Sequence, residues 1–188
     1  MSGMGTYLSG GNTKGTRSPA DFYPTPPEVT QSLIDFLGIP QGATIWEPAS
    51  GEYDMVDVLK QGGYKVIATD IATGTDFLNC DLPDNFDWVI TNPPFSKSEE
   101  FIQRCLTFDR PFAMLLKSQY WHARSRYSLF KDSRPSYILP LTWRPDFLFK
   151  TREDGKRGNS VFEVAWNVWI PHKIPLKSTI YLPLSKPE

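Results

Sequence analysis

The chain has 188 residues, a length typical of one domain, and its 40% hydrophobic and 22% charged residues are an ordinary globular composition. No stretch is long and apolar enough to span a membrane, and two cysteines with two histidines cannot form a metal cluster, so we expect a cytoplasmic protein without metal. Residues 1–99 carry 5 basic and 13 acidic side chains, whereas residues 100–188 carry 15 and 8. The acidic half suits a cationic small molecule, and the basic half suits a polyanion.

The pattern along the chain predicts a flexible segment over residues 1–19 and one domain over residues 20–188. A helix is expected over 25–38, with Thr25 as its N-cap, Pro26 at its first position and Glu28 completing a capping box. Further helices are expected over 52–63, over 96–108 with Ser98 as its cap, and over 123–132. Strands are expected over 43–46, 65–70, 86–91, 111–117, 136–141 and 161–170.

This alternation of strands and helices predicts an α/β fold with a mostly parallel sheet. The last two strands have no obvious helix between them, so they are expected to form an antiparallel hairpin. In open sheets of this class, ligands bind beyond the carboxyl ends of the strands. The residues that follow each strand are therefore the informative ones.

The first strand ends in WEPASGEYDM, where Pro48–Gly51 form a loop of small residues that enters a helix. Backbone N–H groups in such a loop can approach a ligand closely. Glu47 would repel a phosphate but suits a cation. The loop matches neither the P-loop nor the dinucleotide fingerprint GxGxxG, which argues against an oxidoreductase.

The second strand ends in ATDI, and an acid at this place is a standard acceptor for two ribose hydroxyls. Asp70 would take that role, with Ile71 flanking an adenine. In the next segment, GTDFLNCD, Asp76 can accept from an adenine amino group while Phe77 packs on the ring.

The third strand ends in TNPPF, where two prolines stiffen a non-helical corner. An exocyclic NH₂ of a base has its lone pair delocalised into the ring. The side-chain oxygen of Asn92 and the carbonyl of Pro93 can accept its hydrogens and turn the lone pair toward a methyl group. Pro94 holds the geometry and Phe95 can stack on the base, so catalysis works by positioning.

The ordered series YPTPPEV, WEPASGE, ATDI, TDFL and WVITNPPFS resembles the amino-methyltransferase branch of the class I S-adenosylmethionine-dependent fold. More closely it resembles small phage and prophage DNA N6-adenine methyltransferases, over residues 20–171. The resemblance implies a Rossmann-like domain with a seven-stranded sheet, S-adenosylmethionine as cofactor and adenine N6 in DNA as acceptor.

The resemblance also implies roles for individual residues. Asn92, Pro93, Pro94 and Phe95 would form the catalytic corner. The cofactor would be bound by Tyr23, Thr25, Pro26, Glu47, Pro48, Ala49, Ser50, Gly51, Asp70, Ile71, Asp76, Phe77 and Asn92. One departure matters: the family loop continues as G-E-G, whereas this chain has Tyr53 in place of the second glycine. Tyr53 either only crowds the helix entrance or weakens cofactor binding.

The basic half supports DNA as the partner. Lys117 and Gln119 follow a strand end and would line the base pocket. Phosphates would be held by Arg124, Arg126, Lys150, Arg152, Lys156 and Arg157. A base inside a duplex cannot reach the methyl donor, so base flipping or a single-stranded substrate is implied. We also expect relaxed or short sequence preference, or a partner subunit that supplies recognition; a homodimer and a monomer stay open.

Two alternatives remain. The pattern N-P-P-[FY] also serves enzymes that methylate other planar NH₂ groups, so RNA or a protein glutamine is a second candidate acceptor. The third hypothesis is a degenerate fold that binds DNA or a partner without any cofactor. The residue that favours it is Tyr53.

Overall fold

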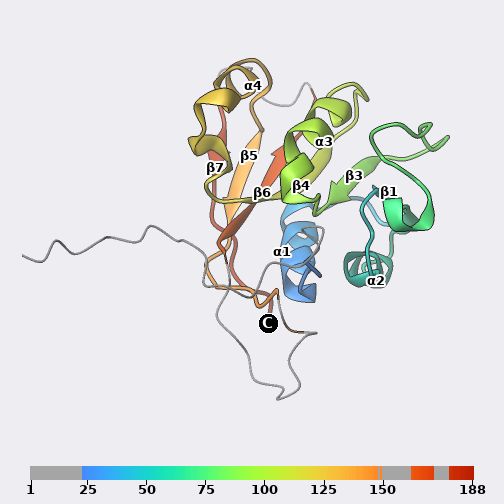
Figure 1. Cartoon of the computed structure of the whole chain (residues 1–188). Helices are drawn as coiled ribbons and strands as arrows, with labels where there is room; N and C mark the ends of the chain where they lie inside the picture. Colours follow the sequence, from blue (N-terminus) through green and yellow to red (C-terminus); the bar gives the residue numbers. More distant parts are fainter. Residues whose placement is uncertain (1–22, 148, 150–161, 172–177) are drawn as a thin grey trace, which may run out of the picture.

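A computed structural model of the chain describes residues 23–147, 149, 162–171 and 178–188. Its strands are Thr44–Glu47 (β1), Lys65–Ala68 (β2), Trp88–Thr91 (β3), Phe112–Lys117 (β4), Tyr137–Pro140 (β5), Val164–Trp169 (β6) and Ile180–Tyr181 (β7). They form one sheet in the order β2-β1-β3-β4-β6-β5-β7 (Figure 1). Every neighbouring pair is parallel except those of β6, which runs antiparallel to β4 and to β5. The predicted α/β class, with a mostly parallel sheet of seven strands and a late antiparallel pair, is confirmed.

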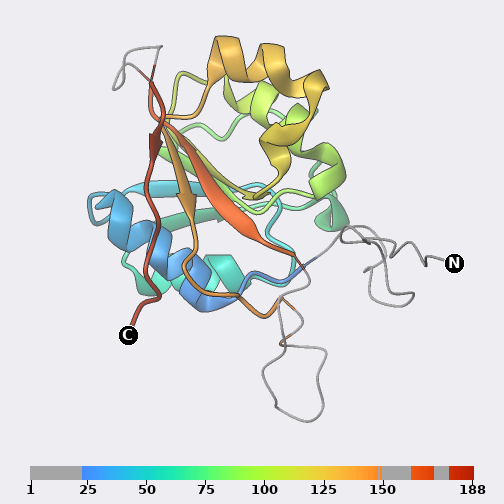
Figure 2. The same cartoon turned by 90° about the vertical axis from the view of Figure 1, so that its left-hand side faces the viewer.

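Helices cover both faces of this sheet. They are Pro27–Leu37 (α1), Asp54–Gln61 (α2), Ser98–Cys105 (α3) and Tyr127–Ser133 (α4). Figure 2 shows α1 and α2 on one side of the sheet, with α3 and α4 on the other. The side chains of β4 alternate accordingly, because Ala113 and Leu115 join the core under α1 while Met114 and Leu116 join the core under α3. Parallel strands buried on both faces read as continuous apolar runs, which is the pattern of FAMLL.

The two cores fix the strands in register. On the α1 side, Trp166 of β6 is fully buried, and its Nε1 donates to the carbonyl of Val29 at 3.0 Å. On the α3 side, the ring of Trp46 lies 5.1 Å from that of Phe77 and 5.4 Å from that of Phe86, between ring centroids. The parallel strands β1, β2, β3 and β4 therefore end at a common edge, where the chain turns into loops.

Both predicted helix caps are wrong. Helix α1 begins at Pro27, one residue later than expected, and its N-cap Pro26 makes no side-chain hydrogen bond. The Thr25 hydroxyl accepts a hydrogen bond from Asn92 instead, at 3.0 Å. Ser98 is the first residue of α3, after the N-cap Lys97, and its hydroxyl donates to the carbonyl of Phe95 at 3.2 Å. Both hydroxyls thus bond to the segment 92–95, that of Thr25 across a long stretch of chain and that of Ser98 within its own turn.

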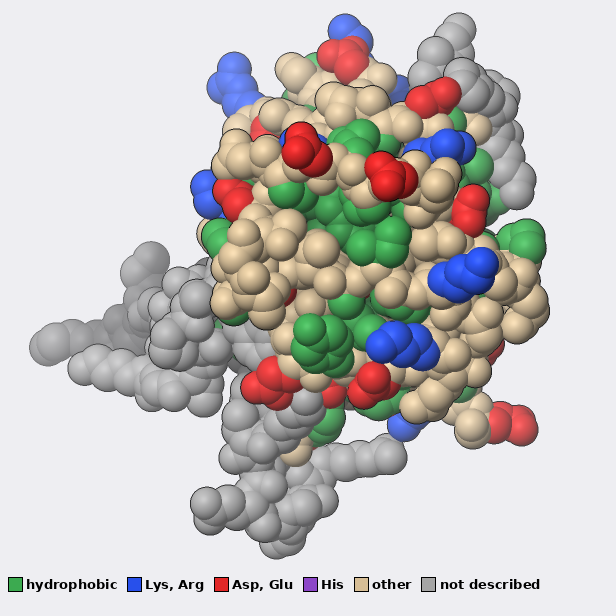
Figure 3. Space-filling model, turned by 90° about the vertical axis from the view of Figure 1, so that its right-hand side faces the viewer, with side chains coloured by type: hydrophobic (Ala, Val, Ile, Leu, Met, Phe, Trp, Pro, Cys, Tyr) green, Lys and Arg blue, Asp and Glu red, His purple; other side chains and the backbone are tan. Residues whose placement is uncertain are grey.

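Charged side chains of both signs are interspersed on the face shown in Figure 3, around a central group of hydrophobic side chains. The acidic and basic halves of the sequence therefore do not give this face a single sign. Strand β7, which the sequence pattern did not indicate, pairs in parallel with β5 at the far edge of the sheet. Among the described residues, no helix is long and apolar enough to cross a membrane.

Candidate active site

A cavity of about 670 Å³, the carboxyl-end cavity, lies where β1, β2 and β3 end. Every predicted cofactor residue except Pro26 is on its wall; Pro26 is buried at the start of α1. Among the described residues that line it, five are acidic and one is a lysine, Lys97, which pairs with Glu100 at 3.0 Å. The five acids are Glu47, Glu52, Asp54, Asp70 and Asp76. Such a wall favours a cationic ligand over a phosphate.

Glu47 ends strand β1 and is almost completely buried. Its Oε1 accepts from the Thr91 hydroxyl at 2.6 Å and from the backbone N–H of Ala49 at 2.9 Å. Burial raises the pKa of Glu47 to about 8, and the charge of Asp70 adds to this, while the two hydrogen bonds oppose it. A pKa near 8 favours the protonated form of this carboxyl group at neutral pH. A positive ligand beside it would favour the ionised form.

Asp70 joins two loops at the floor of the cavity. Its Oδ2 accepts from the N–H of Gly51, and its Oδ1 accepts from the N–H of Ala72, both at 2.8 Å. Each carboxylate oxygen has a further lone pair, so both can still accept from ligand hydroxyls. Beside it, Ile71 lines the cavity with 73% of its surface exposed. A large apolar side chain so exposed at a cavity is a surface that a planar ring can cover.

Asp76 and Phe77 line the cavity but are also part of the fold. The Asp76 carboxylate accepts from the N–H of Leu78 at 3.0 Å and from the side chain of Asn79 at 2.6 Å. Phe77 is 2% exposed, and its ring centroid lies 4.5 Å from that of Phe101. Phe77 therefore holds the loop on α3 and offers a ligand only a small part of its ring.

Asn92 has a fixed orientation. Its Nδ2 donates to the carbonyl of Tyr23 at 3.1 Å and to the hydroxyl of Thr25 at 3.0 Å. The Tyr23 carbonyl can only accept, so the amide must present its nitrogen there. Both amide hydrogens are thereby used, and the side-chain oxygen Oδ1 is the group left for a ligand in the cavity that Asn92 lines.

The rest of the corner is built of prolines and aromatic rings. Pro93 is buried and Pro94 lines the cavity, and the Pro94 carbonyl accepts from the N–H of Lys97 at 2.8 Å. The ring of Phe95 lies outside the cavity wall, 5.8 Å from the ring of Tyr23 and 5.0 Å from that of Phe162. Phe95, the ring predicted to stack on a base, thus contacts Tyr23 of the cavity wall and does not itself line the cavity.

Tyr53 adopts the left-handed backbone conformation, with φ of 69°, as the N-cap of α2. This conformation explains why a glycine suits the position, because an L-residue with a large side chain is strained there. The side chain is 44% exposed and is not among the described residues that line the cavity. The departure from the resemblance therefore places strain in the loop without filling the cavity.

Several lining residues were missed by the sequence reasoning. They are Pro24, Glu52, Asp54, Met55, Ala72, Leu78, Asn79, Lys97 and Phe101. Pro24, Glu52, Ala72, Leu78 and Asn79 lie within two residues after a predicted one, so widening each predicted segment by two residues would have found them. Lys97 also lies two residues after a predicted one, Phe95. Asp54 and Met55 lie on α2 and Phe101 lies on α3, and only their position after a strand-end segment marks them.

The predicted substrate residues are spread over three places. Lys117 ends β4, and its Nζ lies 4.4 Å from the ring centroid of Phe95. Gln119 and Arg124 are exposed. Arg126 donates to the carbonyl of Tyr120 at 2.7 Å and lies 4.0 Å from its ring centroid, so this guanidinium is held by the protein itself. The remaining four, Lys150, Arg152, Lys156 and Arg157, lie outside the described residues.

Arg124 and Arg126 line an open pocket of about 660 Å³, the outer pocket, on the segment that follows β4. Its described lining contains aromatic and basic side chains and no acid: Trp121, His122, Ala123, Arg124, Arg126, Tyr127, Ser128 and Phe130. Tyr127 is 68% exposed. The outer pocket thus differs in charge from the carboxyl-end cavity.

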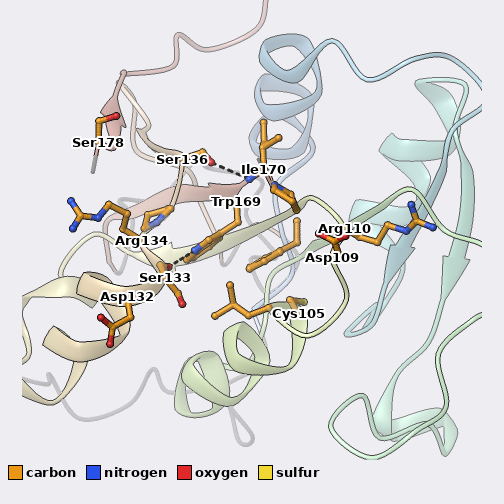
Figure 4. Close-up of a pocket in the computed structure, with 14 residues that line it drawn as sticks. Cys105, Asp109, Arg110, Asp132, Ser133, Arg134, Ser136, Trp169, Ile170 and Ser178 are labelled. Atoms are coloured by element: carbon orange, nitrogen blue, oxygen red, sulfur yellow. Dashed lines mark hydrogen bonds between the residues drawn. The ribbon is translucent and has the colours of Figure 1, made fainter. Parts of the chain in front are cut away.

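A smaller pocket of about 240 Å³, the amino-end pocket, lies at the opposite edge of the sheet, where β4 and β5 begin (Figure 4). Its floor is the stacked pair Phe112 and Trp169, with centroids 4.6 Å apart. Trp169 Nε1 donates to the carbonyl of Ser133 at 2.7 Å, and the Ser136 hydroxyl accepts from the N–H of Ile170 at 3.0 Å. In Figure 4 the side chain of Arg110 points away from this floor.

No protein-family model matches the sequence, and no curated protein matches it significantly. Among solved structures, the methyltransferase subunit of a type I restriction-modification system from Streptococcus thermophilus superposes with a TM-score of 0.58, at 15% identity, over 84% of this chain and 47% of that chain. A Listeria monocytogenes protein assigned to the class I S-adenosylmethionine-dependent methyltransferases gives 0.53, at 16% identity, over 85% of this chain and 65% of that one. This chain thus spans about half of the first structure and less than two thirds of the second. The likeness shows that the chain has the Rossmann-like fold of class I methyltransferases.

Proposed function

We propose that this chain transfers a methyl group from S-adenosylmethionine to the N6 amino group of adenine in DNA. The observation that carries the proposal is the orientation of Asn92. Its two amide hydrogens are bonded to Tyr23 and Thr25, so Oδ1 presents an acceptor to the cavity at the end of β3. A side chain fixed in this way can position an amine without ionising.

The walls of the carboxyl-end cavity fit the cofactor. The two hydroxyls of a ribose suit the spare lone pairs of Asp70, and an adenine ring can cover the exposed Ile71. The methionine end carries a sulfonium and an ammonium, which suit a wall with five acids and one paired lysine. The same wall would repel a pyrophosphate, and this disfavours a nicotinamide or flavin dinucleotide.

The cofactor supplies an electrophilic methyl group on a positively charged sulfur. Asn92 Oδ1, with the carbonyl of Pro93, accepts the hydrogens of the target NH₂ and directs its lone pair at that methyl. With S-adenosylmethionine bound, the amine nitrogen would take the methyl group from the sulfonium, S-adenosylhomocysteine would leave, and the amine would lose one proton to solvent. The residues contribute position rather than a strong base, and well-oriented reactants can gain several orders of magnitude in rate.

A nucleic acid is supported as the acceptor by the outer pocket. Its described lining has aromatic and basic side chains and no acid, which is the composition that binds single strands by stacking and phosphate contacts. Residues 100–188 carry a net charge of +7. DNA and adenine N6, rather than RNA or a glutamine, follow from the resemblance of the TNPPFS segment.

The test uses purified protein with labelled S-adenosylmethionine and three parallel acceptors: unmodified duplex DNA, RNA and total protein. The DNA is hydrolysed and read by mass spectrometry. We expect N6-methyladenine with the wild type and with Asn85→Ala, which removes an exposed asparagine outside the site. Asn92→Ala should lower the rate by at least about 100-fold.

Other results would select other functions. Label found only in RNA, or only in protein, would mean that the acceptor is that molecule and not DNA. No transfer to any acceptor, together with no calorimetric binding of S-adenosylhomocysteine, would contradict the enzyme and favour a binding module with this fold.

A further inference from the structure

Thr25 lies on a short segment, just before α1, whose shape is restricted by prolines. Pro24 and Pro26 flank it, and a residue followed by proline is confined to extended backbone. The Thr25 side chain branches at Cβ, which limits its rotamers as well. Tyr23, two residues earlier, is buried and packs on Phe95 with 5.8 Å between ring centroids. The Thr25 hydroxyl therefore has a defined place on the cavity wall, where the residue is 5% exposed.

This hydroxyl acts only as an acceptor within the described part of the protein. Its Oγ1 accepts from Asn92 Nδ2 at 3.0 Å, and none of the described residues accepts its hydrogen. A threonine hydroxyl has one hydrogen to donate besides its lone pairs. Because Thr25 lines the carboxyl-end cavity, that hydrogen is available to a ligand bound there.

The nearby loop of small residues offers fewer donors than its sequence suggests. The N–H groups of Ala49, Ser50 and Gly51 all donate within the protein, at 2.9, 3.0 and 2.8 Å. Lys97, the one lysine among the described lining residues, already pairs with Glu100. A ligand carboxylate in this acidic cavity therefore needs a side-chain hydroxyl, and that of Thr25 has a hydrogen to give.

The direction of the Thr25 hydroxyl also bears on the orientation of Asn92. A hydroxyl that donates to a ligand presents its lone pairs to Asn92, which places Nδ2 on Thr25 and leaves Oδ1 for the cavity. A hydroxyl that donated to Asn92 would favour the flipped amide, with Nδ2 in the cavity. The flipped amide would present a donor to the target NH₂, which needs an acceptor. A ligand that accepts the Thr25 hydrogen thus adds to the effect of the Tyr23 carbonyl and favours the productive orientation.

We infer that Thr25 is a positioning residue that links the two binding events: its hydroxyl donates to the carboxylate of bound S-adenosylmethionine and thereby keeps the Asn92 amide oriented for the incoming amine. The acidic wall suits the sulfonium and the ammonium of that ligand, whereas its carboxylate requires a donor. The inference rests on the proposed function and deepens it, because it makes the orientation of the amine acceptor depend on an occupied cofactor site.

The test compares Thr25→Val, which removes the hydroxyl and keeps the shape, with Thr25→Ser, which keeps the hydroxyl. Thr30→Val is the matched control, since Thr30 is fully buried on α1 and its hydroxyl has no partner among the described residues. Calorimetry measures S-adenosylhomocysteine and methylthioadenosine, which lacks the amino-acid end. Thr25→Val should lower the affinity for S-adenosylhomocysteine about tenfold and leave that for methylthioadenosine unchanged. Thr25→Ser and Thr30→Val should stay within about twofold of the wild type for both ligands.

The link to Asn92 is read from the side-chain amide signals of Asn92 in the nuclear magnetic resonance spectrum, assigned with Asn92→Ala. In the wild type, S-adenosylhomocysteine should shift these signals more than methylthioadenosine does. In Thr25→Val the two ligands should give equal shifts. In the methyl-transfer assay, kcat of Thr25→Val should fall about tenfold, with the KM for the oligonucleotide within about twofold of the wild type.

Unchanged affinity in Thr25→Val, equal losses for the two ligands, or amide signals that respond as in the wild type would overturn the inference. A lowered melting temperature with a loss of affinity that Thr25→Ser does not restore would overturn it too and assign Thr25 a structural role. The expected affinities and amide signals without methyl transfer by the wild type would support the role of Thr25 and contradict only the proposed reaction. If the wild type binds no S-adenosylhomocysteine, both proposals fail.

Discussion

The two ends of the sheet carry pockets of different character. At the carboxyl end, Asp70 and Asn92 are held by backbone and side-chain hydrogen bonds and still present acceptors to a cavity of about 670 Å³. At the amino end, Trp169 and Ser136 bond to the neighbouring backbone beside a pocket of about 240 Å³ that has an aromatic floor. The first set of polar groups keeps acceptor atoms that the protein itself does not use, and we propose that they bind a ligand. The second set bonds to the surrounding fold.

The contrast between the two ends indicates which polar groups are available to a ligand. A side chain whose hydrogen bonds leave an acceptor facing a cavity is pre-oriented for a ligand at little further entropy cost. A side chain bonded to its neighbours on a packed floor contributes to stability. Substitutions at the carboxyl end should therefore change ligand affinity, whereas substitutions at the amino end should change stability.

The largest expected difference concerns the carboxylates. Asp70→Ala removes the acceptors proposed for the ribose and the bonds that hold Gly51 and Ala72, so the affinity for S-adenosylhomocysteine should fall on the order of 100-fold. Asp132→Ala, at the amino-end pocket, should leave the affinity unchanged. Isothermal calorimetry measures both. Equal affinities of the two variants would remove the distinction between the two ends.

The next difference concerns pH. Burial raises the pKa of Glu47 to about 8 from 4.5, so the folded protein keeps a proton that the unfolded chain releases. The free energy of unfolding should therefore fall as the pH rises from about 4.5 to about 8, by on the order of 1 kcal/mol per pH unit, and level off above.

Glu47→Gln has no proton to lose, so this slope should disappear, whereas Asp132→Asn should keep it. Urea unfolding at several pH values within the window measures the slope. A wild-type slope in Glu47→Gln would show that another group causes it.

The smallest difference concerns backbone strain. Each end has a residue other than glycine with positive φ: Tyr53 at 69° beside the cavity and Asp109 at 48° in the amino-end pocket. Aspartate tolerates this conformation better than tyrosine. Tyr53→Gly should therefore raise the free energy of unfolding by up to about 1 kcal/mol, and Asp109→Gly should change it less.

Cofactor affinity should stay the same in Tyr53→Gly, because the side chain is not among the described residues on the cavity wall. Thermal unfolding and calorimetry together test this. A tenfold gain in affinity would mean that Tyr53 obstructs the cofactor.

Much of this fold is readable from the sequence. The apolar spacing of Val29, Leu33 and Ile34 predicted α1, and the apolar run FAMLL predicted the strand that the structure shows as β4. The cavity wall was also largely predictable, since parallel strands place Glu47, Asp70 and Asn92 at one edge once their alternation with helices is recognised. Short-range patterns suffice for these features because they depend on neighbouring residues.

Contacts between segments far apart in the chain could be read only from the folded structure. Thr25 was expected to cap its own helix, yet its hydroxyl orients Asn92, 67 residues away in the chain. Lys117 was expected in the base pocket, but its position over Phe95 depends on β3 and β4 being neighbours in the sheet. The order of residues along the chain was enough to predict which of them follow the strands. Their hydrogen-bond partners depended on strand order and packing, because one hydroxyl or amide has several possible partners and only the folded arrangement selects among them.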